Sequence, residues 1–164
     1  MTRLTFFQEY QKIKNMTIEE EIKQPRFRNP YQKVVINLIY TTNWLENKRA
    51  KFFKPFGITT AQYNILRILR GQGKNKISGA EVKARMLERN SDISRLLDRL
   101  SIKKWITRIK CPEDKRATDV MITEAGLNVL QQIDGHMEAS EKKIIHLSKE
   151  EALELSRLLD KSRG

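Results

Sequence analysis

The spacing of hydrophobic residues along the chain predicts a mainly helical protein. Apolar side chains recur at i, i+3, i+4 and i+7 in most segments, which is typical of helices that bury one face. Several segments open on a capping box, in which Ser or Thr is followed three residues later by Glu or Gln; the boxes are Thr17–Glu20, Thr59–Gln62, Ser78–Glu81 and Ser148–Glu151. Beyond a short N-terminal helix, the predicted helices cover about residues 31–54, 59–71, 78–86, 90–100, 123–146 and 148–161.

The helix predicted over residues 90–100 has the sharpest division between its two faces. Its apolar stripe consists of Ile93, Leu96, Leu97 and Leu100. The opposite face is polar and holds Asp92, Ser94, Arg95, Asp98 and Arg99. Short hydroxyl side chains and planar arginines are what the reading of a base edge requires. The pattern therefore indicates a helix that can enter the major groove of DNA.

Two short strands are predicted after this helix, over residues 105–110 and 118–122, because both segments are rich in β-branched and aromatic residues. The loop CPEDKRA joins them and contains residues that favour turns. Ile77 is a candidate for a one- or two-residue strand beside this hairpin. The basic residues of the hairpin tip are Lys110, Lys115 and Arg116. A helix that can enter a groove, followed at once by a basic hairpin, is the layout of a winged DNA-binding module.

The predicted fold class is mainly α with a small β-hairpin wing (α+β): a winged helix-turn-helix with long N- and C-terminal dimerisation helices. The short helices over 78–86 and 90–100, joined by a brief turn, make the helix-turn-helix. The long helices over 31–54 and 123–146 carry more apolar residues than a small DNA-reading unit can bury. Burial against a second copy solves this, which predicts a two-fold homodimer with recognition helices about 34–36 Å apart.

The N-terminal segment is set apart from this arrangement. Pro25 and Pro30 bracket a break in the helical pattern. We therefore expect residues 1–30 to form a helical arm that packs on the rest of the chain or on a partner, with a partly disordered leader as the alternative. The remaining predicted divisions are the winged helix-turn-helix domain over 31–164, its DNA-reading unit over about 58–123, and its dimerisation helices over about 31–54 and 124–161.

The charge balance narrows the class of partner. Lys and Arg total 32 and Asp and Glu total 20, which leaves a formal net charge of +12. Such an excess points to a polyanion, with nucleic acid first and an anionic membrane surface second. Cys111 is the single cysteine, so no intramolecular disulfide can form and the chain suits a reducing cytoplasm. No apolar run suits a transmembrane helix or a signal peptide, so we expect a cytoplasmic protein without a membrane partner.

Enzymatic chemistry finds no support in the sequence. There is no glycine-rich phosphate loop and no Cys/His or Ser/His constellation at motif spacing. His136 and His146 lie ten residues apart, without the spacing or the further ligands of a metal site. We therefore expect no catalytic residue, no metal and no cofactor.

The chain resembles the MarR family of winged helix-turn-helix transcriptional regulators over about residues 31–161. The matching segments are ITTAQYNILRIL (58–69), SGAEVKARM (78–86), SRLLDRL (94–100), ITRI (106–109) and PEDKRATDVMITEAG (112–126). The last is the most specific, because the family pattern there is an Asp, one residue, an Arg and then a strand that ends in Leu/Ile-Thr-x-x-Gly. The residues that fill this pattern are Asp114, Arg116, Ile122, Thr123 and Gly126.

The resemblance implies a homodimer that binds a pseudo-palindromic operator in double-stranded DNA, and in many members a small molecule releases the DNA. The residues placed toward the major groove would be Asn90, Ser91, Asp92, Ser94 and Arg95. Arg99 and nearby lysines would meet phosphates, and Lys110 and Lys115 of the wing are expected on the DNA as well. Arg116 would enter the minor groove, where negative potential favours arginine, and Asp114 would brace it.

Three departures from the family pattern bear on these roles. Two positions that usually hold glycine hold Leu87 and Lys104. A lysine at positive φ costs about 1 kcal/mol or more, so the helix is expected to end without a left-handed cap. Asp92 on the reading face would repel phosphates unless it accepts from a cytosine or pairs with an arginine.

Several of these residues have plainer explanations. Asn90 and Ser91 compete for the N-cap of the helix, and Arg95 and Arg99 could pair with the aspartates at positions 92 and 98 on a solvated face. Cys111 could sense oxidants, although the sensing cysteines of relatives lie in the N-terminal helical region. Four aromatic residues could line an effector pocket or belong to the core or dimer interface: Tyr40, Trp44, Phe52 and Phe53.

Together these features predict a sequence-specific double-stranded DNA-binding transcriptional regulator, namely a homodimeric repressor relieved by a small-molecule effector. The alternative is a winged-helix module that docks a partner protein without operator-specific DNA binding. The basic wing favours DNA, because interaction modules of this fold tend to lose it.

Overall fold

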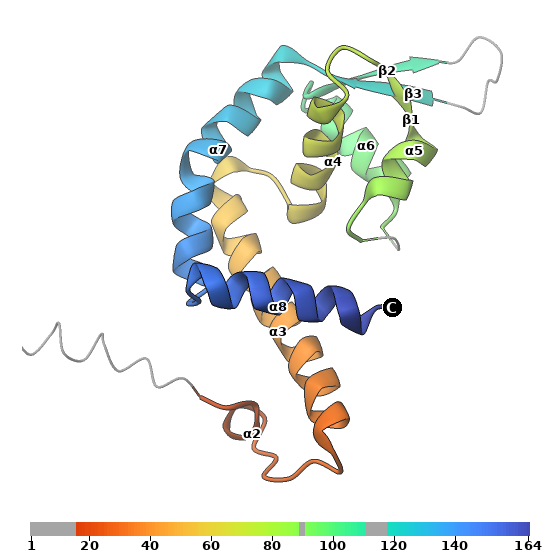
Figure 1. Ribbon diagram of the computed structural model, residues 1–164. Coiled ribbons are helices and arrows are strands. Elements are labelled where there is room, and N and C mark those ends of the chain that lie inside the picture. The colour runs from red at the N-terminus through yellow and green to blue at the C-terminus, as the bar shows by residue number, and fades with distance from the viewer. Residues whose placement is uncertain (1–15, 89–90, 111–117) are drawn as a thin grey trace, which may run out of the picture. The chain divides into compact units, whose positions relative to one another are not determined.

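The computed structural model describes residues 16–88, 91–110 and 118–164. Its elements follow in the order α2 (Ile18–Glu21), α3 (Pro30–Phe53), the 3-10 helix η1 (Lys54–Phe56), α4 (Thr60–Gly71), β1 (Ile77–Ser78), α5 (Gly79–Arg85), α6 (Ile93–Ile102), β2 (Ile106–Lys110), β3 (Thr118–Ile122), α7 (Glu124–Ile144) and α8 (Lys149–Ser162) (Figure 1). The chain forms two compact units, Met1–Trp44 and Leu45–Gly164, and their boundary falls within α3.

The described part of the N-terminal unit consists of α2 and the first portion of α3. The capping box predicted at the start of α2 is confirmed. Glu19 of α2 pairs with Lys33 of α3 at 2.7 Å, and this hydrogen bond lowers the pKa of the Glu19 carboxyl. The Tyr40 hydroxyl donates to the Glu21 carboxylate at 2.6 Å, which raises the pKa of Tyr40. Two polar contacts therefore join α2 to α3, and Ile18 of α2 is buried.

A three-stranded antiparallel sheet lies in the second unit, with strand order β1-β3-β2. β2 and β3 form a hairpin that pairs in register from Ile106 with Ile122 to Lys110 with Thr118. β1 pairs Ile77 with Val120 at the other edge of β3, which confirms the short strand expected at Ile77. The mainly helical fold with a small β wing is therefore the one that the sequence predicts.

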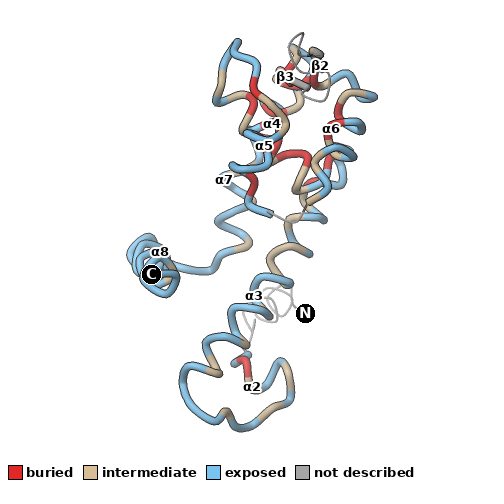
Figure 2. The backbone as a smooth tube through the Cα atoms, turned by 90° about the vertical axis from the view of Figure 1, so that its right-hand side faces the viewer, coloured by how far each residue is buried: buried red, intermediate tan, exposed pale blue. Residues whose placement is uncertain are grey.

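The core of this unit lies between the sheet and helices α4 to α7 (Figure 2, red segments). In α6, Leu97 and Leu100 are buried and Ile93 and Leu96 pack partly buried against the core, which confirms the predicted apolar stripe. The largest fully buried side chains are Phe53, Ile65, Leu66, Leu69, Leu100, Leu130, Ile133, Val82 and Val120. One continuous core thus fixes α6 and the hairpin in a defined relation.

Helix boundaries follow the local signals in the sequence. Capping boxes open α4, α5 and α8 as predicted, and Thr123 caps α7. α3 ends at Phe53, before Pro55, and Gly57 then takes a φ of 63° that reverses the chain into α4.

The terminal helices keep much apolar surface uncovered in a single copy. In α8, Leu153, Leu155 and Leu158 are 64%, 46% and 47% exposed, and the helix is exposed over nearly its whole length (Figure 2). The exposed apolar residues of α3 are Tyr31, Val34, Val35, Leu38 and Ile39. None of the helices formed by the described residues combines the length and the hydrophobicity needed to cross a lipid bilayer.

Candidate nucleic-acid interface

The N-terminus of α6 is capped by a residue that was expected to face DNA. The Asp92 carboxylate accepts a hydrogen bond from the Arg95 backbone N–H at 3.2 Å, and Asp92 has the extended backbone of an N-cap. The expectation that Asn90 or Ser91 caps this helix is therefore wrong. The Ser91 hydroxyl instead donates to Glu88 at 3.0 Å. The carboxylate that threatened to repel phosphates thus has an intramolecular role.

The exposed polar face of α6 consists of Ser94, Arg95, Asp98 and Arg99, and we call it the reading face. The helical period places these side chains opposite the buried Leu97 and Leu100. Among the ion pairs of the described residues, neither Arg95 nor Arg99 takes part. The pairing of these arginines with Asp92 and Asp98, the plainer alternative, is therefore not observed.

Asp98 is paired, but with the wing. Its carboxylate accepts from the guanidinium of Arg108 in β2. Sequence reasoning did not single out Arg108, although a signal was present. Successive strand residues alternate between faces, so Arg108 shares a face with the buried Ile106, and a charge on such a face calls for a partner.

The C-terminus of α6 ends in a left-handed turn that the sequence did not predict. Lys104 has a φ of 59°; the expectation that the helix ends without a left-handed cap is wrong. The Trp105 N–H donates to the Leu100 carbonyl at 3.1 Å and the Lys104 N–H to the Ser101 carbonyl at 2.9 Å. These two bonds make a Schellman motif, which normally has glycine at the left-handed position.

The same turn is joined to the start of α7. The Thr123 hydroxyl donates to the Lys104 carbonyl at 2.7 Å, and the Thr123 N–H donates to the Trp105 carbonyl at 3.0 Å. The hydroxyl also accepts from the Gly126 N–H at 3.2 Å. A Cβ on Gly126 would clash with the Trp105 carbonyl oxygen. The Thr-x-x-Gly pattern therefore serves the close approach of α7 to the end of α6.

The Lys103 side chain also contacts residues at this junction. Its ammonium group lies 4.5 Å from the centre of the Trp105 ring and donates to the Gly57 carbonyl. Of the lysines near α6, this one is occupied by contacts within the protein, so it is a weaker candidate for phosphate binding than Arg99.

The wing tip and one predicted contact before α6 lie outside the described residues. The predicted positions concerned are Asn90, Cys111, Asp114, Lys115, Arg116 and the side chain of Lys110. Their roles stay predictions.

A hollow of about 430 Å³ opens at the N-terminal end of the reading face. The predicted residues Ser91, Asp92 and Ser94 line it, together with Lys83 of α5 and Arg108 of β2. The structure therefore brings three predicted residues together with two cations that the sequence reasoning missed. Lys83 lacked a distinguishing signal, because it is one exposed lysine among many.

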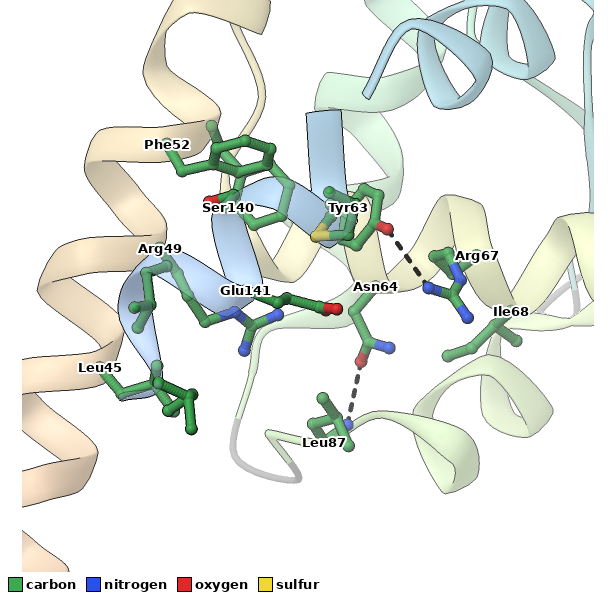
Figure 3. A pocket seen from close by; sticks show the side chains of 14 residues that line it. Leu45, Arg49, Phe52, Tyr63, Asn64, Arg67, Ile68, Leu87, Ser140 and Glu141 are labelled. Atoms are coloured by element: carbon green, nitrogen blue, oxygen red, sulfur yellow. Dashed lines mark hydrogen bonds between the residues drawn. The ribbon is translucent and has the colours of Figure 1, made fainter. Parts of the chain in front are cut away.

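A second cavity, of about 670 Å³, is lined by the C-terminal part of α3, by α4 and α7, and by Leu87 of the helix-turn-helix (Figure 3). We call it the cavity behind the helix-turn-helix. Phe52 and Phe53 are among its lining residues, and Phe53 is also part of the core. Tyr40 and Trp44, the other two candidates for an effector pocket, belong to the N-terminal unit and are not among its lining residues. The polar lining residues are Arg49, Asn64, Arg67, Ser140 and Glu141. The described residues contain no cluster of side chains able to hold a metal ion.

Two hydrogen bonds order the lining of this cavity (Figure 3). The Arg67 guanidinium donates to the Tyr63 hydroxyl at 3.3 Å. The side-chain amide oxygen (Oδ1) of Asn64 accepts from the Leu87 backbone N–H at 3.0 Å. Leu87 belongs to the turn between α5 and α6, so the cavity borders directly on the helix-turn-helix.

Comparisons with known proteins agree with this geometry. Residues 56–117 match the model of the MarR family. The chain is 43% identical over 74 residues to the uncharacterized HTH-type transcriptional regulator YpoP of Bacillus subtilis, which is 44% of this chain and 50% of that protein. It is 32% identical over 96 residues to the multiple antibiotic resistance protein MarR of Salmonella typhimurium, which is 58% of this chain and 65% of that protein. The chain thus spans between half and just under two thirds of the length of these relatives.

Solved structures match over more of the chain. A mutant MarR from E. coli complexed with operator DNA superposes with a TM-score of 0.67 at 25% identity, covering 82% of this chain and 98% of that one. A putative MarR-like transcription regulator from Bacillus cereus gives a TM-score of 0.73 at 22% identity, covering 81% and 95%. The second likeness supports the fold alone.

Proposed function

Because the chain belongs to the MarR family of winged helix-turn-helix transcriptional regulators, we propose that it binds double-stranded DNA in a sequence-specific manner and regulates transcription. The observation that carries this proposal is the reading face of α6, where Arg95 and Arg99 are exposed and form no ion pair with any described residue. Arginines left free in this way are available to guanine edges and phosphates. The family consists of regulators and not of enzymes, in agreement with the expectation of a non-enzymatic protein.

The proposed contacts follow the geometry of the reading face. Ser91, Ser94 and Arg95 lie at the N-terminal end of α6, the end that contacts base edges in helix-turn-helix proteins. Arg99, one turn further along, would meet the phosphate backbone. Asp92 acts as the helix cap in this proposal and only secondarily as a base contact. The wing residues proposed to flank these contacts are Lys110, Lys115 and Arg116, with Asp114 as the brace.

We propose a homodimer as the DNA-binding form. The uncovered apolar stripes of α3 and α8 support it, because a second copy with the same stripes is self-complementary. Such a dimer would present two copies of α6 to a pseudo-palindromic operator, in the cytoplasm where a reduced Cys111 is expected. Bound there, it would act as a repressor.

The cavity behind the helix-turn-helix supports release by a small molecule. Arg49 and Arg67 contribute two positive charges against the one negative charge of Glu141, and Phe52, Phe53 and Tyr63 contribute aromatic surface. This lining suits an organic anion with an aromatic ring. Thermal-shift measurements with aromatic carboxylates and their neutral amides test this ligand class; the carboxylates should raise the melting temperature and weaken DNA binding, and equal effects of both series would contradict it.

The DNA proposal is tested by fluorescence anisotropy with a duplex of about 30 base pairs recovered by selection, which is long enough for two half-sites one helical turn apart. The Arg95→Ala variant should bind it at least about 1 kcal/mol more weakly and discriminate less against random DNA. Arg157→Ala, in α8, is the matched control and should bind normally. If the wild type shows no preference for any duplex, the result contradicts sequence-specific binding and favours a winged-helix module that docks a partner protein.

A further inference from the structure

The reading face carries a carboxylate that ought to oppose DNA binding. Asp98 lies one helical turn after Ser94 on the same exposed side of α6, and its side chain is 56% exposed. A carboxylate on this face approaches the DNA phosphates when the helix enters a groove. Unlike Asp92, Asp98 is not at the helix end and has no backbone N–H to cap.

Arg108 offsets this charge from the neighbouring element. The register of the hairpin sets Arg108 opposite Val120, a fully buried residue of β3. Its backbone position is therefore fixed by the sheet, and its guanidinium meets Asp98 from the side of the wing. The Arg108 side chain is 32% exposed, less than that of Asp98. The cation is thus the more deeply seated partner of the pair.

We infer that Arg108 is a positioning residue for DNA recognition: it neutralises Asp98 and draws that carboxylate away from the DNA phosphates. This inference rests on the proposed DNA-binding function. Stability alone does not explain the pair, since exposed ion pairs of this kind contribute little to folding. The pair also joins α6 to the first wing strand, so that the helix and the wing approach DNA as one unit.

The inference predicts an asymmetry between the two partners. Arg108→Met leaves Asp98 unpaired on the reading face, so affinity for the selected duplex should fall at least about tenfold, because like charges placed against each other across an interface are costly. Asp98→Asn removes the repulsive charge and should bind at least as tightly as the wild type. The double variant should recover most of the affinity that Arg108→Met loses. Arg108→Lys, which keeps the charge, should bind almost normally even if the methionine variant folds poorly.

A different outcome of this double-mutant cycle would overturn the inference. If the double variant binds as weakly as Arg108→Met while Asp98→Asn is normal, Arg108 itself contacts the DNA. If Asp98→Asn weakens binding as much as Arg108→Met, the pair is only a structural link. If Arg108→Met binds normally, the pair has no role in recognition. If the wild type binds no duplex, the proposed function fails and this inference fails with it. If the wild type binds and only the variants depart from the expected pattern, this inference alone fails.

The chain offers a matched control pair. Arg70 of α4 and Asp134 of α7 form an ion pair whose side chains are 35% and 40% exposed, and neither residue belongs to the reading face. Arg70→Met and Asp134→Asn should leave duplex affinity unchanged, alone and together. A loss of affinity in these variants equal to that of Arg108→Met would show that any broken surface pair weakens binding.

Discussion

At the residue scale, the junction between α6 and the wing depends on two unusual backbone positions. Lys104 takes a left-handed conformation that costs an L side chain about 1–2 kcal/mol. It is held there by its own N–H bond to Ser101 and by the Thr123 hydroxyl on its carbonyl. Gly126 lets the Trp105 carbonyl approach α7. Both positions serve one purpose, which is to turn the chain sharply between the reading helix and the sheet.

Replacement of Lys104 by glycine should therefore stabilise the protein. Glycine adopts positive φ without strain, although it also adds freedom to the unfolded chain, so the expected gain is about 0.5–1 kcal/mol. Urea denaturation measures it. Lys103→Gly should instead destabilise the protein, because Lys103 has a φ of −74° and its side chain contacts Trp105 and the Gly57 carbonyl. A lower urea midpoint for Lys104→Gly than for the wild type would contradict this. It would show that the Lys104 side chain stabilises the protein by more than its positive φ destabilises it.

Gly126→Ala should destabilise the protein by about 1–3 kcal/mol, because the new methyl group meets backbone that cannot move without opening the junction. Gly135→Ala in the same helix is the matched control. Nothing lies within 4 Å of a Cβ there, so alanine should stabilise α7 by up to about 1 kcal/mol. Thermal melts measure both effects: the melting temperature should fall for Gly126→Ala and rise for Gly135→Ala. A change in the same direction for both variants would contradict this prediction.

Single residues are also where sequence reasoning reached its limit. Asn90, Ser91 and Asp92 are all good N-cap residues, and the choice among them depends on how the chain enters α6 after the turn at Leu87. The pairing of Asp98 with Arg108 is a contact between two elements, which no spacing within one element reveals. The alternation of β2 could have flagged Arg108, but it could not have named its partner.

At the element scale, the helices were predictable because the capping residues and the apolar stripe of each helix lie within its own segment of the sequence. Thr59, Ser78 and Ser148 cap α4, α5 and α8 in capping boxes, and the stripe of α6 coincides with its buried side. The register of the hairpin and the tie between α6 and α7 were not predictable, because they depend on contacts between residues distant in the chain.

The cap of α6 gives a prediction at this scale. Asp92→Ala leaves the Arg95 N–H without its acceptor and should destabilise the protein by about 1 kcal/mol, whereas Asp92→Asn keeps an acceptor and should cost less. Chemical denaturation followed by circular dichroism measures both. Equal losses would mean that the charge at the helix N-terminus matters more than the hydrogen bond.

At the scale of the whole molecule, the exposed apolar stripe of α8 needs a partner. Leu158 is 47% exposed in a single copy; in the proposed dimer it becomes buried. Leu158→Glu should therefore shift the protein from a dimer toward its monomer mass of 19.3 kDa in light scattering. Arg157→Glu adds the same charge without removing an apolar side chain and should leave the dimer intact. A wild type that is already monomeric would contradict the dimer.

In the proposed complex, two copies of α6 read DNA as a two-fold unit, and footprinting on a duplex selected from the genome of origin measures this arrangement. The proposed dimer should protect two symmetry-related sites on one face of the duplex, with centres about 10–10.5 base pairs apart. A single asymmetric site, or no protection beyond that on random DNA, would contradict it.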